Sequence, residues 1–109
     1  MRTIMVAAAL GVVLVQLAMA EKGKGFLDGN TLFDWCVKHS PAGTACTDYI
    51  AGVADALAYD GKFCPSVGVS PDQVVDVVTQ YLTTFPERRH YAAASLVADA
   101  LAAKFPCAQ

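Results

Sequence analysis

The sequence has little charge and few of the residues on which catalysis commonly depends. Only 17% of its 109 residues are charged, with eight Lys and Arg, ten Asp and Glu, and two His. The basic residues form no extended cluster, which argues against nucleic acid as a partner. Neither His39 nor His90 lies in a metal-ligand motif such as His-x-x-x-His, and no glycine-rich phosphate loop occurs. We therefore expect no enzyme, no cofactor and no metal site.

The first 20 residues have the three parts of a secretory signal peptide. Arg2 supplies positive charge, Ile4–Ala18 is apolar apart from one glutamine, and Ala18-Met19-Ala20 is a small-x-small cleavage site. The apolar run is short for a membrane span, which needs about 20 residues. The sequence therefore predicts residues 1–20 as a cleaved signal peptide and an exported mature protein with no membrane segment.

The remaining residues suffice for one small domain. Residues 21–109 carry seven basic and ten acidic side chains. We expect a flexible N-terminal tail at 21–25 and a helical domain at 26–107. Apolar residues rarely alternate with period two, so strands are not expected, and the helical period dominates. The sequence predicts an all-α fold.

Four helical segments are expected after the tail. The first two run from about Asn30 or Thr31 to His39 and from about Ala45 to Tyr59. The third opens at Ser70 and has Leu82 on its apolar face, and the fourth runs from Thr84 to about Lys104. Gly61 is placed to end the second helix in the left-handed conformation. Short breaks between helices favour antiparallel neighbours. This predicts an up-down-up-down arrangement in which the second and fourth helices end at one pole.

Polar residues at the start of each segment can accept the free N–H groups of a first helical turn. Asn30 or Thr31 is expected to cap the first helix, and Thr44 the second. The third segment opens with Ser-x-x-Gln at Ser70–Gln73, and the fourth with Thr-x-x-Glu at Thr84–Glu87. Both patterns are typical of a capping box.

The four cysteines, Cys36, Cys46, Cys64 and Cys107, follow an export signal and predict two disulfides. They contain no Cys-x-x-Cys pair, which zinc sites usually have. Cys46 and Cys64 are expected at opposite ends of one helix, roughly 20 Å apart, whereas a disulfide needs Cα atoms within about 7 Å. Up-down-up-down packing favours Cys36–Cys46 with Cys64–Cys107. The predicted fold is thus a small four-helix bundle-like domain stapled by two disulfides.

One segment breaks a local rule and is our candidate for partner binding: Pro86, Glu87, Arg88, Arg89 and His90. Glu87 suits the positive end of a helix dipole, whereas Arg88 and Arg89 so near that end are mildly unfavourable. A departure of this kind can mark a functional patch. A solvated helix face is the alternative explanation.

With these features identified, the sequence resembles the Rap/Tai-type immunity proteins of type VI secretion systems. The matching segments are FLDGNTLFDWC at Phe26–Cys36, CTDYIAGVADAL at Cys46–Leu57, and the segment Cys64–Cys107. The order Cys, Cys-x-x-Tyr-Ile-x-Gly, Cys-Pro, Phe-Pro-Cys is specific in combination. The resemblance covers nearly all of the chain after the signal peptide.

The resemblance implies a periplasmic, all-helical, non-enzymatic protein that binds and inhibits a peptidoglycan amidase effector and acts as a homodimer. By this analogy the turn Thr83–His90 is the best candidate for the interface. Because family membership alone does not settle function, two other functions stay open. One is a periplasmic acid-stress-type chaperone, which should expose apolar surface on acidification. The other is a helical adaptor module of the envelope.

Overall fold

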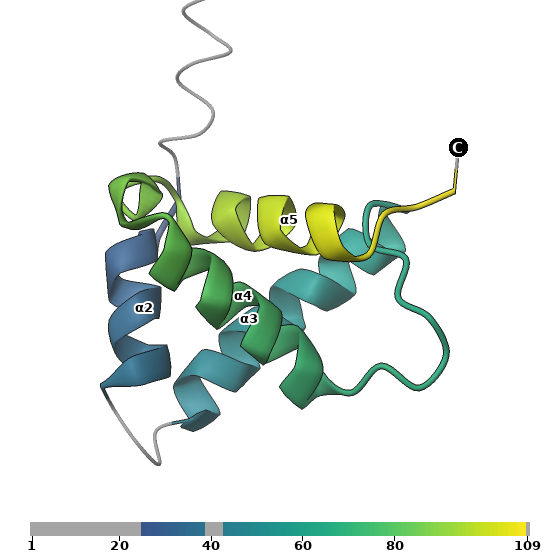
Figure 1. Ribbon diagram of the computed structural model, residues 1–109, viewed down its shortest axis with the longest axis horizontal. Helices are drawn as coiled ribbons and strands as arrows, with labels where there is room; N and C mark the ends of the chain where they lie inside the picture. The colour runs from purple at the N-terminus through teal and green to yellow at the C-terminus, as the bar shows by residue number, and fades with distance from the viewer. Residues whose placement is uncertain (1–24, 39–42, 109) are drawn as a thin grey trace, which may run out of the picture.

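The computed structural model describes residues 25–38 and 43–108, which form four α-helices and one 3₁₀-helix (Figure 1). These elements are α2 (Gly29–Val37), α3 (Gly43–Tyr59), α4 (Pro71–Thr84), η1 (Pro86–Arg88) and α5 (Ala93–Lys104). No strand occurs within the described residues, so the predicted all-α class is confirmed. The predicted signal peptide, and the predicted tail apart from residue 25, lie outside the described residues.

All four α-helices contribute to one apolar core. Its buried members are Leu32, Cys46, Ile50, Ala54, Phe63, Val74, Val78, Leu82, Ala93, Leu96, Val97, Ala100 and Leu101. Five of them belong to α5, which contributes more buried residues than any other helix described here. No polar or charged side chain of the described residues is buried. The core is therefore stabilised by apolar packing, without the desolvation cost of buried polar groups.

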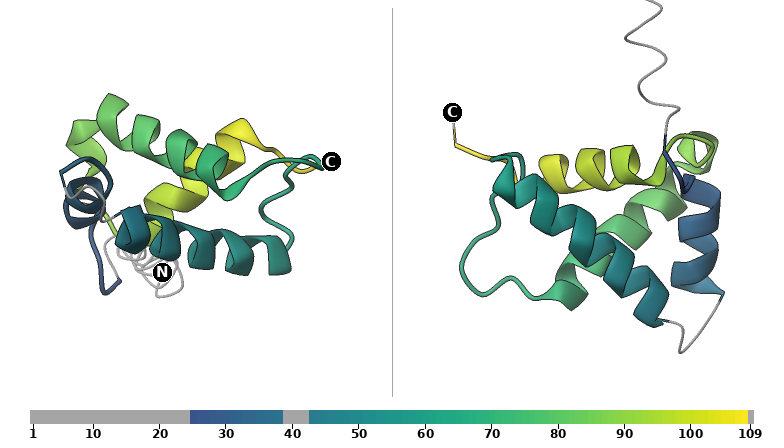
Figure 2. Two further views of the ribbon diagram at one scale, coloured as in Figure 1. Left: turned by 90° about the horizontal axis from the view of Figure 1, so that it is seen from below. Right: turned by 180° about the vertical axis from the view of Figure 1, so that it is seen from behind.

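The chain reverses direction between successive helices, but the helices cross obliquely instead of lying side by side (Figures 1 and 2). The helix α4 packs against both α3 and α5. Helix α2 lies at one end of the molecule, and α3 and α5 both run toward the other. The expectation that these two helices end at one pole is confirmed.

Two disulfides connect the elements in the predicted pairing. Cys36 at the end of α2 is bonded to Cys46 in α3, and Cys64 after α3 is bonded to Cys107 after α5. The Cα atoms of each pair are 5.0 Å apart. The two bonds fix opposite ends of α3, one to the preceding helix and one to the chain's end.

The predicted starts of the first two helices were wrong by a few residues. Asp28, not Asn30 or Thr31, caps α2: its extended backbone leads into the helix, and its carboxylate accepts a hydrogen bond from the Thr31 N–H at 2.8 Å. The helix α2 ends at Val37, and the expected end at His39 lies outside the described residues. The helix α3 begins at Gly43, so Thr44 lies within it and is not its cap.

The predicted capping box of the third helix is confirmed. The Ser70 hydroxyl accepts a hydrogen bond from the Gln73 N–H at 3.3 Å, and the Gln73 amide oxygen accepts one from the Ser70 N–H at 2.8 Å. Gly61, after α3, has φ of 72°, which confirms its expected left-handed conformation. Both features depend only on residues close in sequence.

The predicted capping box at Thr84–Glu87 was wrong, because a different structure occupies this segment. Thr84 is the last residue of α4, and its hydroxyl donates to the Gln80 carbonyl at 2.8 Å. Phe85 leaves the helical conformation, with φ of −120° and ψ of 64°, as the residue before a proline commonly does. Pro86–Arg88 then forms η1, and α5 starts only at Ala93.

Candidate partner-binding turn

The connection between α4 and α5 is bound to the start of α2 through backbone hydrogen bonds. The Gly29 N–H donates to the Tyr91 carbonyl at 2.9 Å, and the Asn30 N–H donates to the Arg89 carbonyl at 2.8 Å. The Ala93 N–H, at the start of α5, donates to the Leu27 carbonyl at 2.8 Å. Two free N–H groups in the first turn of α2 and one in that of α5 are thus satisfied by a neighbouring segment. This pairing holds the connection in one conformation.

The close approach of these two segments depends on the absence of a side chain at Gly29. A Cβ atom there would lie 2.8 Å from the Arg89 carbonyl oxygen and 2.9 Å from its Cα atom. It would also clash with a methyl group of Leu96. A glycine at this position therefore lets the turn rest directly on α2.

Arg89 points toward the protein rather than toward solvent. Its Nε donates to the Leu82 carbonyl at 2.7 Å, and its guanidinium lies 3.6 Å from the centroid of the Phe33 ring. The carbonyl of Leu82 belongs to the last turn of α4, where backbone acceptors have no partner within the helix. Arg89 thus caps α4 and packs against α2, which is a structural role.

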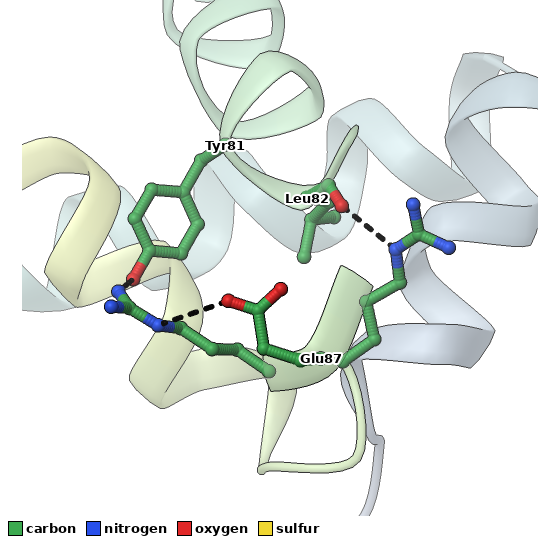
Figure 3. A network of polar contacts seen from close by, with 5 residues as sticks. Tyr81, Leu82 and Glu87 are labelled. Carbon is green, nitrogen blue, oxygen red and sulfur yellow. Dashed lines mark hydrogen bonds and ion pairs between the residues drawn. The ribbon is translucent and has the colours of Figure 1, made fainter. Parts of the chain in front are cut away.

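Arg88 lies on the outside of the turn and organises an exposed cluster with its neighbours. Its Nη1 donates to the Tyr81 hydroxyl at 2.8 Å, and its Nε lies 4.0 Å from a Glu87 carboxylate oxygen. The guanidinium covers the Phe85 ring at 4.3 Å. The hydrogen bond to Tyr81 raises the pKa of Arg88 above its usual value. Figure 3 shows Tyr81, Leu82 and Glu87 around the two arginines, with dashed lines to the Glu87 carboxylate and the Leu82 carbonyl.

The structure separates the five predicted site residues into two groups. Pro86, Glu87, Arg88 and His90 are exposed, whereas Arg89 is half-buried. The four exposed side chains are available to a partner, and Arg89 holds the turn beneath them. The dipole argument treated both arginines alike because they are adjacent in sequence, so it could not separate these roles.

Three residues that sequence reasoning did not include lie beside the exposed group. A shallow hollow is lined by Glu87 and Arg88 from η1, by Tyr91, and by Asp99 from α5. Tyr81 from α4 reaches the same cluster through its bond to Arg88. Tyr91 could have been suspected because it follows the predicted segment directly. Nothing local in the sequence indicates Tyr81 or Asp99, which the fold brings there.

The chemistry of this surface suits contact with another protein. It combines both signs of charge with aromatic rings, and Tyr and Arg are enriched among the residues that dominate binding energy at interfaces. Among the described residues, no group of three or more His, Cys, Asp or Glu side chains could hold a metal ion. Within the described part of the chain, no helix has the length and apolar composition needed to cross a membrane.

Comparison with known proteins places the chain in a family. A family model of Rap1a immunity proteins matches residues 28–107, a range that includes every described helix and all four cysteines. No curated protein and no solved structure matches the chain. The family match covers most of the sequence and confirms the resemblance to immunity proteins. This chain therefore belongs to the Rap1a family of immunity proteins.

Proposed function

We propose that this protein is a periplasmic immunity protein that binds and inhibits a peptidoglycan amidase effector of type VI secretion. The observation that carries the proposal is the family match over the whole helical domain. Two disulfides support an oxidising compartment such as the periplasm. The signal-peptide pattern of residues 1–20 supports export to the same place.

The surface that inhibits is, in this proposal, the exposed part of the turn: Pro86, Glu87, Arg88 and His90. Hydrogen bonds to α2 and the Arg89 contacts already order this turn in the free protein. An ordered turn loses little conformational entropy when it binds, so more of its contact energy appears as affinity. Inhibition by covering the active-site cleft of the effector requires no catalytic residue of the immunity protein.

The proposal is tested by measuring inhibition of the amidase effector by the protein purified from the periplasm. The readout is cleavage of peptide crosslinks in isolated peptidoglycan. We expect tight inhibition with one immunity protein bound per active site. Arg88→Glu reverses a charge at the centre of the exposed cluster and should raise the inhibition constant about tenfold or more.

Lys104→Glu is the matched control, because it makes a similar charge reversal at an exposed residue near the end of α5. It should leave inhibition unchanged. Equal effects of Arg88→Glu and Lys104→Glu would contradict the proposed interface. Absence of inhibition by the wild-type protein, together with normal growth of effector-exposed cells lacking it, would contradict the function itself.

The proposal also includes self-association, since the resemblance implies a homodimer. The alanine-rich surface of α5 leaves little side-chain bulk to prevent close approach of another helix. Light scattering from the purified protein should give twice the mass of one chain at micromolar concentration. A mass of one chain across the whole concentration range would contradict the proposed dimer but not the proposed inhibition.

A further inference from the structure

An apolar cavity of about 160 Å³ opens between α3 and the connection that leads from α3 to α4. Ala51 and Ala54 line it from α3, Pro65 and Val69 from the connection, and Val74 from α4. The two alanines leave space that a larger side chain would fill. The cavity is separate from the α4–α5 turn, since none of its lining residues belongs to that turn.

The volume of the cavity suits one large apolar side chain. A protein cavity of roughly 150 Å³ is large enough to bind benzene, whereas pockets for small-molecule ligands and cofactors usually measure about 300–1,000 Å³. A Leu, Met or Phe side chain from a partner fits these limits. A cofactor does not.

The wall formed by the connection is held in place before any partner binds. Phe63 is buried and packs edge-to-face on Phe105, with ring centroids 5.6 Å apart. The next residue, Cys64, is bonded to Cys107. At its other end the connection joins α4 through the capping box at Ser70. A preformed cavity of this kind binds without first having to order its own walls.

Two exposed large apolar side chains lie close in sequence to residues that line the cavity. Val67 is fully exposed and lies in sequence between the lining residues Pro65 and Val69. The connection that contains these residues bulges away from the helices (Figures 1 and 2). Tyr59 is 93% exposed and follows Asp55 by four positions on α3, which places the two on one helix face. Exposed apolar groups around a cavity are typical of a protein interaction site.

Besides an apolar side chain, the charge at the cavity rim indicates that a partner should carry a cation. Asp55 is the charged residue among those that line the cavity. In the described part of the chain the ion pairs join Lys38 to Asp34 and Arg88 to Glu87, so Asp55 has no cationic partner there. A cation carried beside the apolar side chain of a bound segment would complement this carboxylate.

We propose that this cavity is a second docking site for the effector, and that it receives one large apolar side chain whose neighbouring Lys or Arg pairs with Asp55. The inference rests on the proposed immunity function and adds to it a contact remote in sequence from the inhibiting turn. The effector then contacts the α4–α5 turn and the α3–α4 connection together. The apolar contact supplies affinity, and the charge pair favours one orientation.

The test compares three substitutions on neighbouring positions of α3. Ala51→Phe fills the cavity from within and should weaken effector binding about tenfold or more, because burial of one large apolar side chain is lost. Asp55→Asn removes the charge with little change of shape and should weaken it about two- to fivefold. Gly52→Ala is the control: it lies beside Ala51, has open space around it and does not line the cavity, so affinity should not change.

Affinities are measured by calorimetry, and thermal unfolding of each variant establishes that it is folded. Effector binding by Ala51→Phe and Asp55→Asn within twofold of wild type would overturn the inference and leave the proposed function intact. A change from dimer to monomer in Ala51→Phe, with inhibition retained, would instead assign the cavity to self-association and overturn the inference as well.

A second measurement does not depend on the effector. Random peptides displayed on phage are selected on the immobilised wild-type protein. Selection should enrich Leu, Met or Phe next to Lys or Arg, and the enriched peptides should lose binding to Ala51→Phe. Peptides without this pattern, or peptides that bind Ala51→Phe equally well, would overturn the inference even if the amidase proves to be the wrong target.

Discussion

Gly29 and Gly52 both lie on helices, yet their surroundings predict that an added methyl group changes the stability of the protein in opposite directions. Gly29→Ala places a Cβ against the Arg89 backbone and Leu96, and overpacking of this kind typically costs about 1–3 kcal/mol. Gly52 has no neighbour within 4 Å of the same position. Gly52→Ala should therefore stabilise the protein by about 0.5–1 kcal/mol through helix propensity. Urea denaturation measures the free energy of unfolding of both variants. An unchanged value for Gly29→Ala would contradict the close approach of the Arg89 backbone to α2.

Adjacent Arg88 and Arg89 should differ in their effect on stability. Arg89→Ala leaves the Leu82 carbonyl without its donor and removes the contact with Phe33, which should lower the free energy of unfolding by about 1–3 kcal/mol. Arg88→Ala should have a smaller effect because its contacts are exposed. Arg89→Lys should restore only part of the loss, since an ammonium cannot stack as a planar guanidinium does. Equal losses for the two alanine variants would exclude a structural role specific to Arg89.

At the scale of elements, the sequence predicted helix ends that depend on nearby residues and missed those that depend on distant ones. The Ser70 capping box involves only Gln73, three positions away, and it formed as expected. The similar pattern at Thr84 did not form a cap, because Pro86 forces Phe85 out of the helical conformation. The Ala93 N–H at the start of α5 donates instead to the Leu27 carbonyl. No local pattern indicates an acceptor so far away in the chain.

The cap of α2 should make a pH-dependent contribution to stability. The backbone N–H of Thr31 donates to the Asp28 carboxylate and lowers the pKa of Asp28 below its ordinary value of 3.8. A lowered pKa in the folded state means that the stabilisation is complete above the ordinary pKa and is lost as the pH falls from there through the lowered pKa of the folded state. The stabilising contribution of Asp28 should therefore decrease below about pH 4.

Asp28→Asn separates the charge from the cap, because Asn caps helices about as well as Asp. As the pH falls from about 5 to about 2.5, the wild type should lose more unfolding free energy than Asp28→Asn does. Asp28→Ala removes the cap and should cost about 0.5–2 kcal/mol at neutral pH. A wild-type to Asn difference that stays constant over this range would contradict the ionic part of the cap.

For the whole molecule, the cysteine positions predicted the disulfide pairing, whereas the helix patterns did not predict how the helices cross. Opposite ends of one helix cannot be bridged, and this excluded the Cys46–Cys64 pairing without any knowledge of the fold. The oblique crossing of the helices could not be predicted, since it depends on contacts between distant segments such as the bridge of Asp28 with Ala92. The candidate turn was found from charge, but its support by α2 and the shallow hollow that Tyr91 and Asp99 form beside it emerge only when the chain is folded.

The two disulfides should differ in their resistance to reduction. Cys64 is exposed at the pole where α3 and α5 end, whereas Cys46 is 2% exposed within the core. Thiol–disulfide exchange requires access of the attacking thiolate to a sulfur atom. Mild reductant at neutral pH should therefore open Cys64–Cys107 first. Alkylation with iodoacetamide followed by mass spectrometry of peptides identifies which cysteines were opened.

Opening this bond should lower stability without abolishing the fold. Chain entropy alone attributes roughly 4 kcal/mol to a crosslink of this sequence separation and roughly 3 kcal/mol to the shorter one, while the apolar core involves all four α-helices. The partly reduced protein should keep its helical circular dichroism at room temperature and unfold at lower temperature. The Cys64→Ser, Cys107→Ser double variant should unfold at the same temperature as the partly reduced protein. Alkylation of Cys36 and Cys46 before the other pair would contradict the burial argument.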